Sequence, residues 1–476
     1  MKPAVAEASK EAAPPSFVYP AAASTKQTTR VGGKAVSYTA TAGALPVRDP
    51  KNKTIAQVVY TAYTLDGPRD PNRPVTFAFN GGPGAASVFL HMGAIGPKRV
   101  QFGAQGDAPS DSAVLKDNPY TWLDFTDLVF IDPVNTGFSR SLVDEAETKK
   151  AFYGVEQDIS YLSRIIYDWL VKNERLTSPK YIAGESYGGF RAPRLAHKLQ
   201  SELGVGVSGL VIISPLFDGS SWVGGDYSPM QWVVTLPTMA AANYERQGKA
   251  LTAAQMGEVE AYARGEFAAD LLKGWSDPAA LDRIVTKVTH YTGLPQDKVR
   301  EWGGRVETRA ILRELYRKEG RVGSWYEANV TLPDAFPWAP DQRMGDPLLE
   351  GLVAPTTSAY VDLVTRQIGW KVDDRYYALN LNVITNWDIP NSRVESVGAF
   401  RRALANDPKM KVLVVHGYGD LATPYMSSKI IIDQVPPNVA GDRLALKVYA
   451  GGHMFYSRAD SGAAMRSDVM ALYGAR

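Results

Sequence analysis

The sequence predicts an α/β protein built on a doubly wound, mostly parallel sheet. Short apolar runs recur along the chain, each followed by a loop containing Gly, Asp or Asn, as is typical of buried parallel strands with functional loops at their C-terminal ends. Helical patterns at residues 155–173 and 190–203 lie between such runs, so strands and helices alternate. Residues 36–41 and 55–65 are rich in β-branched and aromatic side chains and predict an opening antiparallel pair. The expected parallel strands are VTFAF (75–79), DLVFI (127–131), KYIA (180–183), LVII (210–213), KVLVV (411–415) and LALKVY (444–449).

A change of pattern in the middle of the chain predicts an insertion. Residues 1–24 are rich in Ala, Pro and Ser and are expected to form a flexible leader. Residues 25–219 and 395–476 form the predicted catalytic core, and residues 220–394, with charged helical segments and Trp-bearing loops, form a helical insertion or cap domain. Eight of the ten Trp residues fall in this insertion, which fits either a lid over a substrate cleft or the aromatic core of a small helical domain.

Composition excludes several classes of function. The 476 residues carry a formal charge of only +2 with no long Lys/Arg run, so we expect no nucleic-acid partner. The absence of Cys excludes disulfides, thiolate nucleophiles and cysteine-ligated metals, and we expect no cofactor and no metal site. No apolar stretch is long enough to insert into a membrane. The leader lacks the apolar core of a signal peptide, which fits a cytoplasmic protein, or a periplasmic or secreted one if the leader replaces a removed signal.

The segment Gly184-Glu185-Ser186-Tyr187-Gly188 is the one G-x-S-x-G motif of the chain. It follows a predicted strand and precedes a predicted helix, which is the context of a nucleophile elbow in the α/β-hydrolase fold. Glycines are needed there because a Cβ on either flank of the strained serine would collide with neighbouring backbone. We therefore predict an α/β-hydrolase with Ser186 as its nucleophile.

The partners of the serine are expected in the order Ser, acid, His. Of five histidines, only His453, after the last strand, fits the base; His91 and His197 are interpreted as structural, His290 belongs to the insertion, and His416 precedes the preferred acid. That acid is Asp420, in the loop after KVLVV, and Asp218, one strand earlier, is the alternative.

A glycine-rich loop supplies the expected oxyanion hole. Asn80-Gly81-Gly82-Pro83-Gly84 follows the strand VTFAF, where this fold places one backbone donor. The N–H groups of Gly82 and Tyr187 are assigned to the developing oxyanion.

A set of motifs lies in residues 55–219 and 395–476: NGGPG, NPYTW, the FIDP and GFS pair, GESYGG, GYGD and GGHM. Together they resemble the serine carboxypeptidase family, which includes carboxypeptidase Y and cathepsin A. The resemblance implies hydrolysis of the C-terminal residue of a peptide through an acyl-enzyme. It also implies that Asn80 and Glu185 bind the free C-terminal carboxylate of the substrate.

The role implied for Glu185 depends on its protonation. A carboxyl group can donate a hydrogen bond only while protonated, so peptidase activity is expected to be acid-favoured. The chain departs from the family pattern at Ala85, where a Cys is usual, and at Ala94, where a second Glu is common and could have been a partner of Glu185.

Two other functions remain as alternatives. One is an esterase or acyltransferase that uses the same triad, and the other is a catalytically silent binding protein. Asn80 and Glu185 favour a peptide substrate over the first, and the intact set of catalytic residue types argues against the second.

Overall fold

A ten-stranded sheet organises the computed structural model, which describes residues 19–101, 110, 113–219, 228–339, 343–389 and 395–475. The first three strands and β7 pair antiparallel, and the pairs from β7 to β14 are parallel, which confirms the predicted mostly parallel sheet and its opening antiparallel pair. In spatial order the strands are β1 (Ala23–Val31), β2 (Lys34–Arg48), β3 (Thr54–Leu65), β7 (Asp127–Ile131), β4 (Val75–Phe79), β9 (Lys180–Glu185), β10 (Gly209–Ile213), β13 (Lys411–Gly417) and β14 (Leu444–Tyr449), with β8 (Arg140–Ser141) beside β3.

The central strands are apolar on both faces because helices cover both faces. In β10, Leu210 and Ile212 belong to one core cluster while Val211 and Ile213 belong to another, as the two-residue period of a strand requires. The first cluster includes side chains of α3 (Val155–Lys172), α4 (Tyr187–Glu202) and α13 (Val397–Asn406). The second includes side chains of α1 (Val88–Leu90), η1 (His91–Ile95), α11 (Pro347–Asp362), η6 (Leu363–Ile368) and α16 (Ala459–Tyr473). This is the arrangement of the α/β-hydrolase fold.

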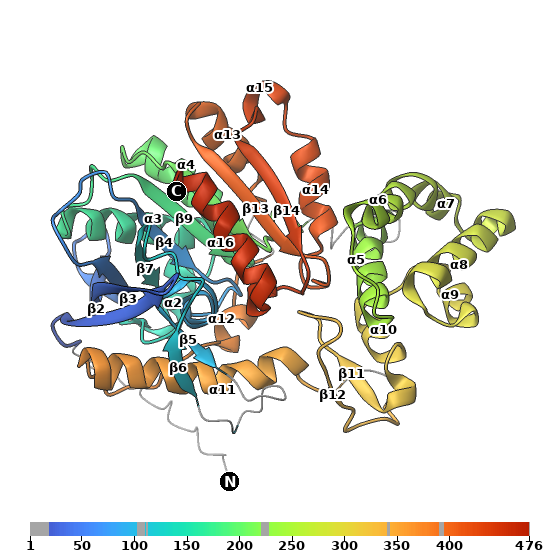
Figure 1. Cartoon of the computed structure of the whole chain (residues 1–476), viewed down its shortest axis with the longest axis horizontal. Coiled ribbons are helices and arrows are strands. Elements are labelled where there is room, and N and C mark those ends of the chain that lie inside the picture. Colours follow the sequence, from blue (N-terminus) through green and yellow to red (C-terminus); the bar gives the residue numbers. More distant parts are fainter. Residues whose placement is uncertain are drawn as a thin grey trace, which may run out of the picture.

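A helical lobe lies beside the sheet, next to α14 (Tyr425–Asp433) and the β14 edge (Figure 1). It has its own apolar core, to which Leu421 and Tyr425 of the catalytic side also belong. Its elements are α5 (Met230–Arg246), α6 (Ala253–Tyr262), η3 (Ala263–Phe267), α7 (Ala268–Lys273), η4 (Gly274–Ser276), α8 (Pro278–Thr292), α9 (Gln296–Glu301), α10 (Thr308–Glu314), η5 (Arg317–Glu319), β11 (Arg321–Gly323) and β12 (Thr331–Pro333).

The later part of the predicted insertion packs differently from this lobe. Tyr360 of α11 and Leu363 of η6 join the core beneath the sheet, and α12 (Leu381–Thr385) places Val383 in the core cluster on the other face. Residues 220–394 therefore contribute to three cores. The remaining elements are β5 (Lys98–Gln101), β6 (Val114–Asp117), α2 (Glu145–Phe152), α15 (Pro437–Ala440) and η7 (Phe455–Ser457).

The predicted leader falls mostly outside the described residues, which begin at Tyr19. Its last residues differ from the expectation of a flexible segment. The Tyr19 hydroxyl donates to the carbonyl of Phe138 at 2.6 Å, and its ring stacks on Trp370, while β1 begins at Ala23. Within the described ranges, no helix combines the length and apolar character that crossing a membrane requires.

Candidate active site

Ser186 occupies a sharp turn between β9 and α4. Its backbone has φ 60° and ψ −122°, a conformation that L-residues rarely adopt, and it stands immediately before the first residue of the helix. A Cβ on Gly184 would lie 2.0 Å from the carbonyl oxygen of Gly188, and one on Gly188 would lie 2.4 Å from that of Phe79. Both flanking glycines are therefore required by close backbone contacts, as expected for a nucleophile elbow.

Asp420 and His453 meet although 33 residues separate them in the chain. The two lie on the loops after β13 and β14, and His453 Nδ1 is 2.8 Å from Asp420 Oδ2. Both side chains are buried, at 0% and 2% exposure. The carboxylate also accepts the backbone N–H groups of Ala422 and Thr423, each at 2.9 Å, so its orientation is fixed.

The remaining nitrogen of His453, Nε2, faces a cavity of about 390 Å³ that Ser186 also lines. Among the hydrogen bonds of the described residues, none joins Ser186 Oγ to His453 Nε2. Catalytic hydrogen bonds are often long in substrate-free enzymes and shorten when substrate binds. The structure thus brings Asp420 and His453, the predicted acid and base, into contact and places Ser186 in the same cavity.

The glycine-rich loop runs against the elbow. A Cβ on Gly81 would lie 2.5 Å from the backbone nitrogen of Tyr187, so only glycine allows this approach. Gly82 follows with φ 100°, a conformation that favours glycine, and it lines the same cavity. Tyr187 is the first residue of α4, and its N–H has no acceptor within the helix.

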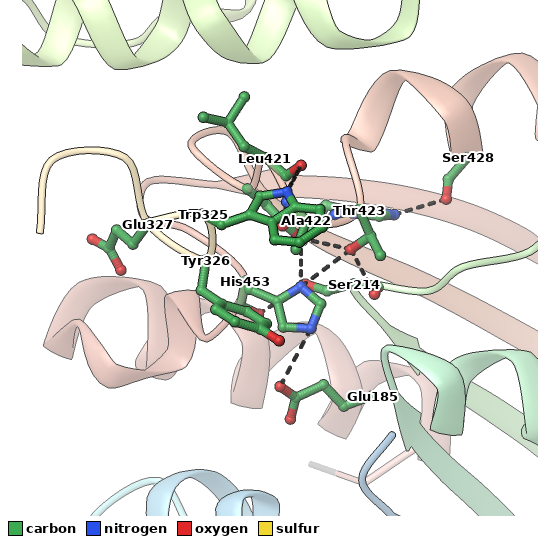
Figure 2. Close-up of polar contacts among 12 residues, drawn as sticks. Glu185, Ser214, Trp325, Tyr326, Glu327, Leu421, Ala422, Thr423, Ser428 and His453 are labelled. Carbon is green, nitrogen blue, oxygen red and sulfur yellow. Dashed lines mark hydrogen bonds and ion pairs between the residues drawn. The ribbon is translucent and has the colours of Figure 1, made fainter. Parts of the chain in front are cut away.

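Asn80 and Glu185 form a buried pair at the same cavity. Asn80 Nδ2 donates to Glu185 Oε2 at 2.8 Å, while Asn80 Oδ1 accepts the N–H of Leu90 at 2.9 Å. The hydroxyl of Tyr456 donates to the same Oε2 at 2.7 Å. The other oxygen, Oε1, lies 4.0 Å from His453 Nε2. Figure 2 shows His453 with one ring nitrogen toward Thr423 and the other toward Glu185.

The electrostatics of Glu185 and His453 are coupled. Burial raises the pKa of the Glu185 carboxyl group to about 7, against the opposing effects of His453, Tyr456 and Asn80. Burial alone would lower the pKa of His453, but the Asp420 carboxylate, and to a smaller extent Glu185, raise it above its ordinary value. Both groups therefore hold a proton to higher pH than they would in water.

The other histidines have different surroundings. His91 is buried with Nε2 2.6 Å from the Tyr63 hydroxyl, and burial lowers its pKa to about 3. His416 is buried beside Ser428, at 2.8 Å, and burial lowers its pKa to about 4. His197 accepts from Arg402 Nε at 3.2 Å, and His290 is exposed.

The alternative acid, Asp218, pairs with another segment of the chain and not with His453 Nδ1. It forms a backbone bridge with Glu395, whereas the contacts of His453 Nδ1 lead to Asp420 and Thr423. The geometry thus favours the acid in the loop after β13 over the one after β10.

Besides Tyr456, the sequence did not mark Thr423, Trp325 and Tyr326 as residues of the site. Thr423 donates to Asp420 Oδ2 at 2.7 Å and lies 3.1 Å from His453 Nδ1; its place three residues after an Asp is a turn signal that could have identified it. Trp325 and Tyr326 come from the loop after β11, in the helical lobe. The Tyr326 carbonyl accepts the N–H of His453 at 2.6 Å, and its ring meets the imidazole edge-on at 5.1 Å (Figure 2). No sequence pattern predicts that long-range contact.

Metal binding finds no support in the described residues, because no group of three or more His, Asp or Glu side chains there could hold an ion.

A family model described as serine carboxypeptidase matches residues 35–251. This range contains Asn80, Gly82 and the elbow, and it ends before Asp420 and His453.

Named relatives match about a third of the chain. Pheromone-processing carboxypeptidase KEX1 of Ogataea parapolymorpha is 31% identical over 157 residues, which cover 32% of this chain and 22% of that protein. Serine carboxypeptidase 1 of Hordeum vulgare is 31% identical over 141 residues, which cover 29% of this chain and 27% of that protein. The chain thus spans about a quarter of the length of the curated relatives it matches.

A solved structure extends the likeness of the fold to most of the chain. The prohormone-processing carboxypeptidase of Saccharomyces cerevisiae has a TM-score of 0.56 and 17% identity, and the match covers 92% of this chain and 91% of that one. Over residues 35–251, this chain is thus similar to the serine carboxypeptidase family.

Proposed function

We propose that this protein is a serine-type carboxypeptidase that removes the C-terminal residue of peptides. Ser186 is the nucleophile, His453 the general base and Asp420 the acid that orients it. The N–H groups of Gly82 and Tyr187 form the oxyanion hole, and Asn80 with Glu185 binds the terminal carboxylate of the substrate.

The reaction follows from this assignment. Ser186 Oγ attacks the last peptide carbonyl while His453 Nε2 takes the hydroxyl proton, and Asp420 stabilises the imidazolium. Collapse of the tetrahedral intermediate breaks the C–N bond, and His453 returns the proton to the leaving amine, so a free amino acid departs. A water molecule, activated by the same base, then hydrolyses the acyl-enzyme. The two backbone donors stabilise the oxyanion in both halves.

The observation that carries the proposal is the Asn80–Glu185 pair beside the nucleophile. An esterase needs no carboxylate-recognising group next to its serine, and burying a carboxyl group costs stability. Burial raises the pKa of Glu185 to about 7, so below that pH it holds a proton that it can donate to the substrate. An exopeptidase thus has a use for Glu185, and a general esterase has none.

The organisation of the chain forms part of the proposal. Residues 25–219 and 395–476 supply the catalytic core, after a leader of residues 1–24. Within the proposed insertion, residues 220–394, the helical lobe acts as a cap, because its Trp325 and Tyr326 line the cavity that holds Ser186.

Three substrates test the function: an N-blocked dipeptide, its C-terminal amide and a short-chain ester. We expect release of the free C-terminal amino acid from the dipeptide. The kcat/KM for the amide should be far below the kcat/KM for the dipeptide. Equal rates on the dipeptide and its amide, or turnover of the ester alone, would reject the carboxypeptidase in favour of an esterase. No turnover of any of the three would point to a binding protein.

A further inference from the structure

The Glu185 carboxyl group has two chemically different oxygens. Oε2 accepts two hydrogen bonds, from Asn80 Nδ2 at 2.8 Å and from the Tyr456 hydroxyl at 2.7 Å. Oε1 has no donor of this kind and faces His453 Nε2 at 4.0 Å. Because two donors already occupy Oε2, a proton taken up by this carboxyl group belongs on Oε1.

The residue that supplies the second donor comes from the segment that carries the base. Tyr456 lies in η7, three positions after His453, and its side chain is 2% exposed. One short stretch after β14 therefore fixes both the imidazole and the carboxyl group beside the nucleophile. Ala94 stands where serine carboxypeptidases commonly have a second Glu, and in this chain a tyrosine hydroxyl contacts Glu185 instead.

We propose that Tyr456 is a positioning residue, whose hydroxyl holds Glu185 Oε2 so that Oε1 carries the proton and donates it to the substrate carboxylate. This inference rests on the proposed function, since it concerns the same carboxylate-binding pair. Tyr456 itself makes no contact with substrate in this account and acts only through Glu185.

The sign of its effect on Glu185 follows from the groups around that carboxyl. His453 and Asp420 are the charged groups that act on it, and the Asn80 amide and the Tyr456 hydroxyl donate to it. A hydroxyl donor stabilises the ionised carboxylate, so the hydrogen bond from Tyr456 lowers the pKa of Glu185 against the effect of burial. Removing the hydroxyl therefore raises that pKa, and Glu185 remains protonated to higher pH.

Tyr456→Phe removes the hydroxyl alone. Two changes are expected in peptide hydrolysis. The alkaline fall of kcat/KM moves up by about one pH unit, the size of a hydrogen bond to a charged group. At acid pH, KM for the peptide rises because the proton is no longer confined to Oε1. The profiles of the wild-type enzyme and the variant therefore cross, which a general loss of structure would not produce.

Tyr449→Phe is the matched control. The Tyr449 hydroxyl also donates to a carboxylate, Asp468 Oδ2, at 2.7 Å, and it lies on the strand before the same loop. Its loss should leave the pH of the alkaline fall in place. In a Glu185→Gln background, adding Tyr456→Phe should leave the alkaline side of the pH profile unchanged, because position 185 no longer carries a titrating carboxyl group.

Binding provides a readout that needs no turnover. In a Ser186→Ala background, the Kd of an N-blocked dipeptide is measured from pH 5 to 9 by calorimetry, with and without Tyr456→Phe, beside the C-terminal amide. The weakening of dipeptide binding at high pH should shift upward with Tyr456→Phe, and the amide should show no such shift.

The role of Tyr456 would be overturned if Tyr456→Phe left the alkaline fall at its wild-type pH in both the kinetic and the binding assay. The proposed carboxypeptidase function would then still stand. A wild-type enzyme that lacks peptide turnover would overturn the proposed function, and this inference with it.

Discussion

Replacing Glu185 by Gln tests how the enzyme recognises a free carboxylate. The structure indicates how the amide would sit. Asn80 and Tyr456 both donate to Oε2, so the carbonyl oxygen of Gln takes that place and its NH₂ group takes the place of Oε1, toward His453. Glu185→Gln therefore imitates the protonated acid at every pH.

The magnitude follows from the pKa of Glu185, which burial raises to about 7. Above that pH the ionised carboxylate meets the substrate carboxylate with like charge, so peptide kcat/KM should fall by about tenfold for each pH unit. The loss should appear in KM. His453 cannot produce this fall, because it must be neutral to act as a base and its titration makes the rate rise with pH.

A second consequence concerns the base. The charge of Glu185 contributes to the raised pKa of His453, so Glu185→Gln should move the acid limb of the profile to lower pH for peptide and ester alike.

The assay is kcat/KM between pH 4 and 9 for an N-blocked dipeptide and a short-chain ester. The wild-type enzyme should show an alkaline fall with the dipeptide only, and the variant should show none. Identical alkaline falls in the two enzymes would remove Glu185 from carboxylate recognition, and with it the main reason to prefer a carboxypeptidase over an esterase.

Further substitutions test the triad and a buried ion pair of the core, Arg191 with Asp158. Ser186→Ala should lower kcat by about a million-fold, since the triad acts as a unit, and a variant that kept a tenth of the activity would end this mechanism. Asp420→Asn should keep the fold, checked by circular dichroism, but cost about four decades in kcat by favouring the wrong imidazole tautomer, whereas a damaging Asp218→Asn would place the acid one strand earlier. Arg191→Met should reduce the free energy of unfolding in urea by about 3–5 kcal/mol, because it leaves the buried Asp158 carboxylate unpaired; a loss below about 1 kcal/mol would contradict this.

Local signals predicted the sheet and the elbow well. The strand of residues 180–183 and the helix that follows it are encoded by an apolar run and by glycines that only the turn at Ser186 requires. By contrast, β1, with the sequence ASTKQTTRV, has too few apolar residues to signal a strand. It forms because β2 offers a partner edge along its whole length, from Ala23 opposite Ala42 to Val31 opposite Lys34.

The sequence did not predict the contacts that form only through tertiary packing. Tyr456 reaches Glu185 across 271 positions of the chain, and Tyr326 reaches His453 from the helical lobe. Neither residue has a spacing or a motif that marks it. The later insertion helices were assigned to a cap by their position in the chain, while Tyr360 and Leu363 pack beneath the sheet because their apolar faces fit the second core cluster there.

The most direct test of the central claim is to label the nucleophile while following peptide cleavage. A serine-directed fluorophosphonate is added in steps, and the modified residue is located by mass spectrometry of proteolytic fragments. We predict one label per chain, on Ser186, with release of the C-terminal amino acid from the dipeptide lost in proportion to labelling. Full release of that amino acid by an enzyme fully labelled on Ser186, or its loss through labelling elsewhere, would contradict the account.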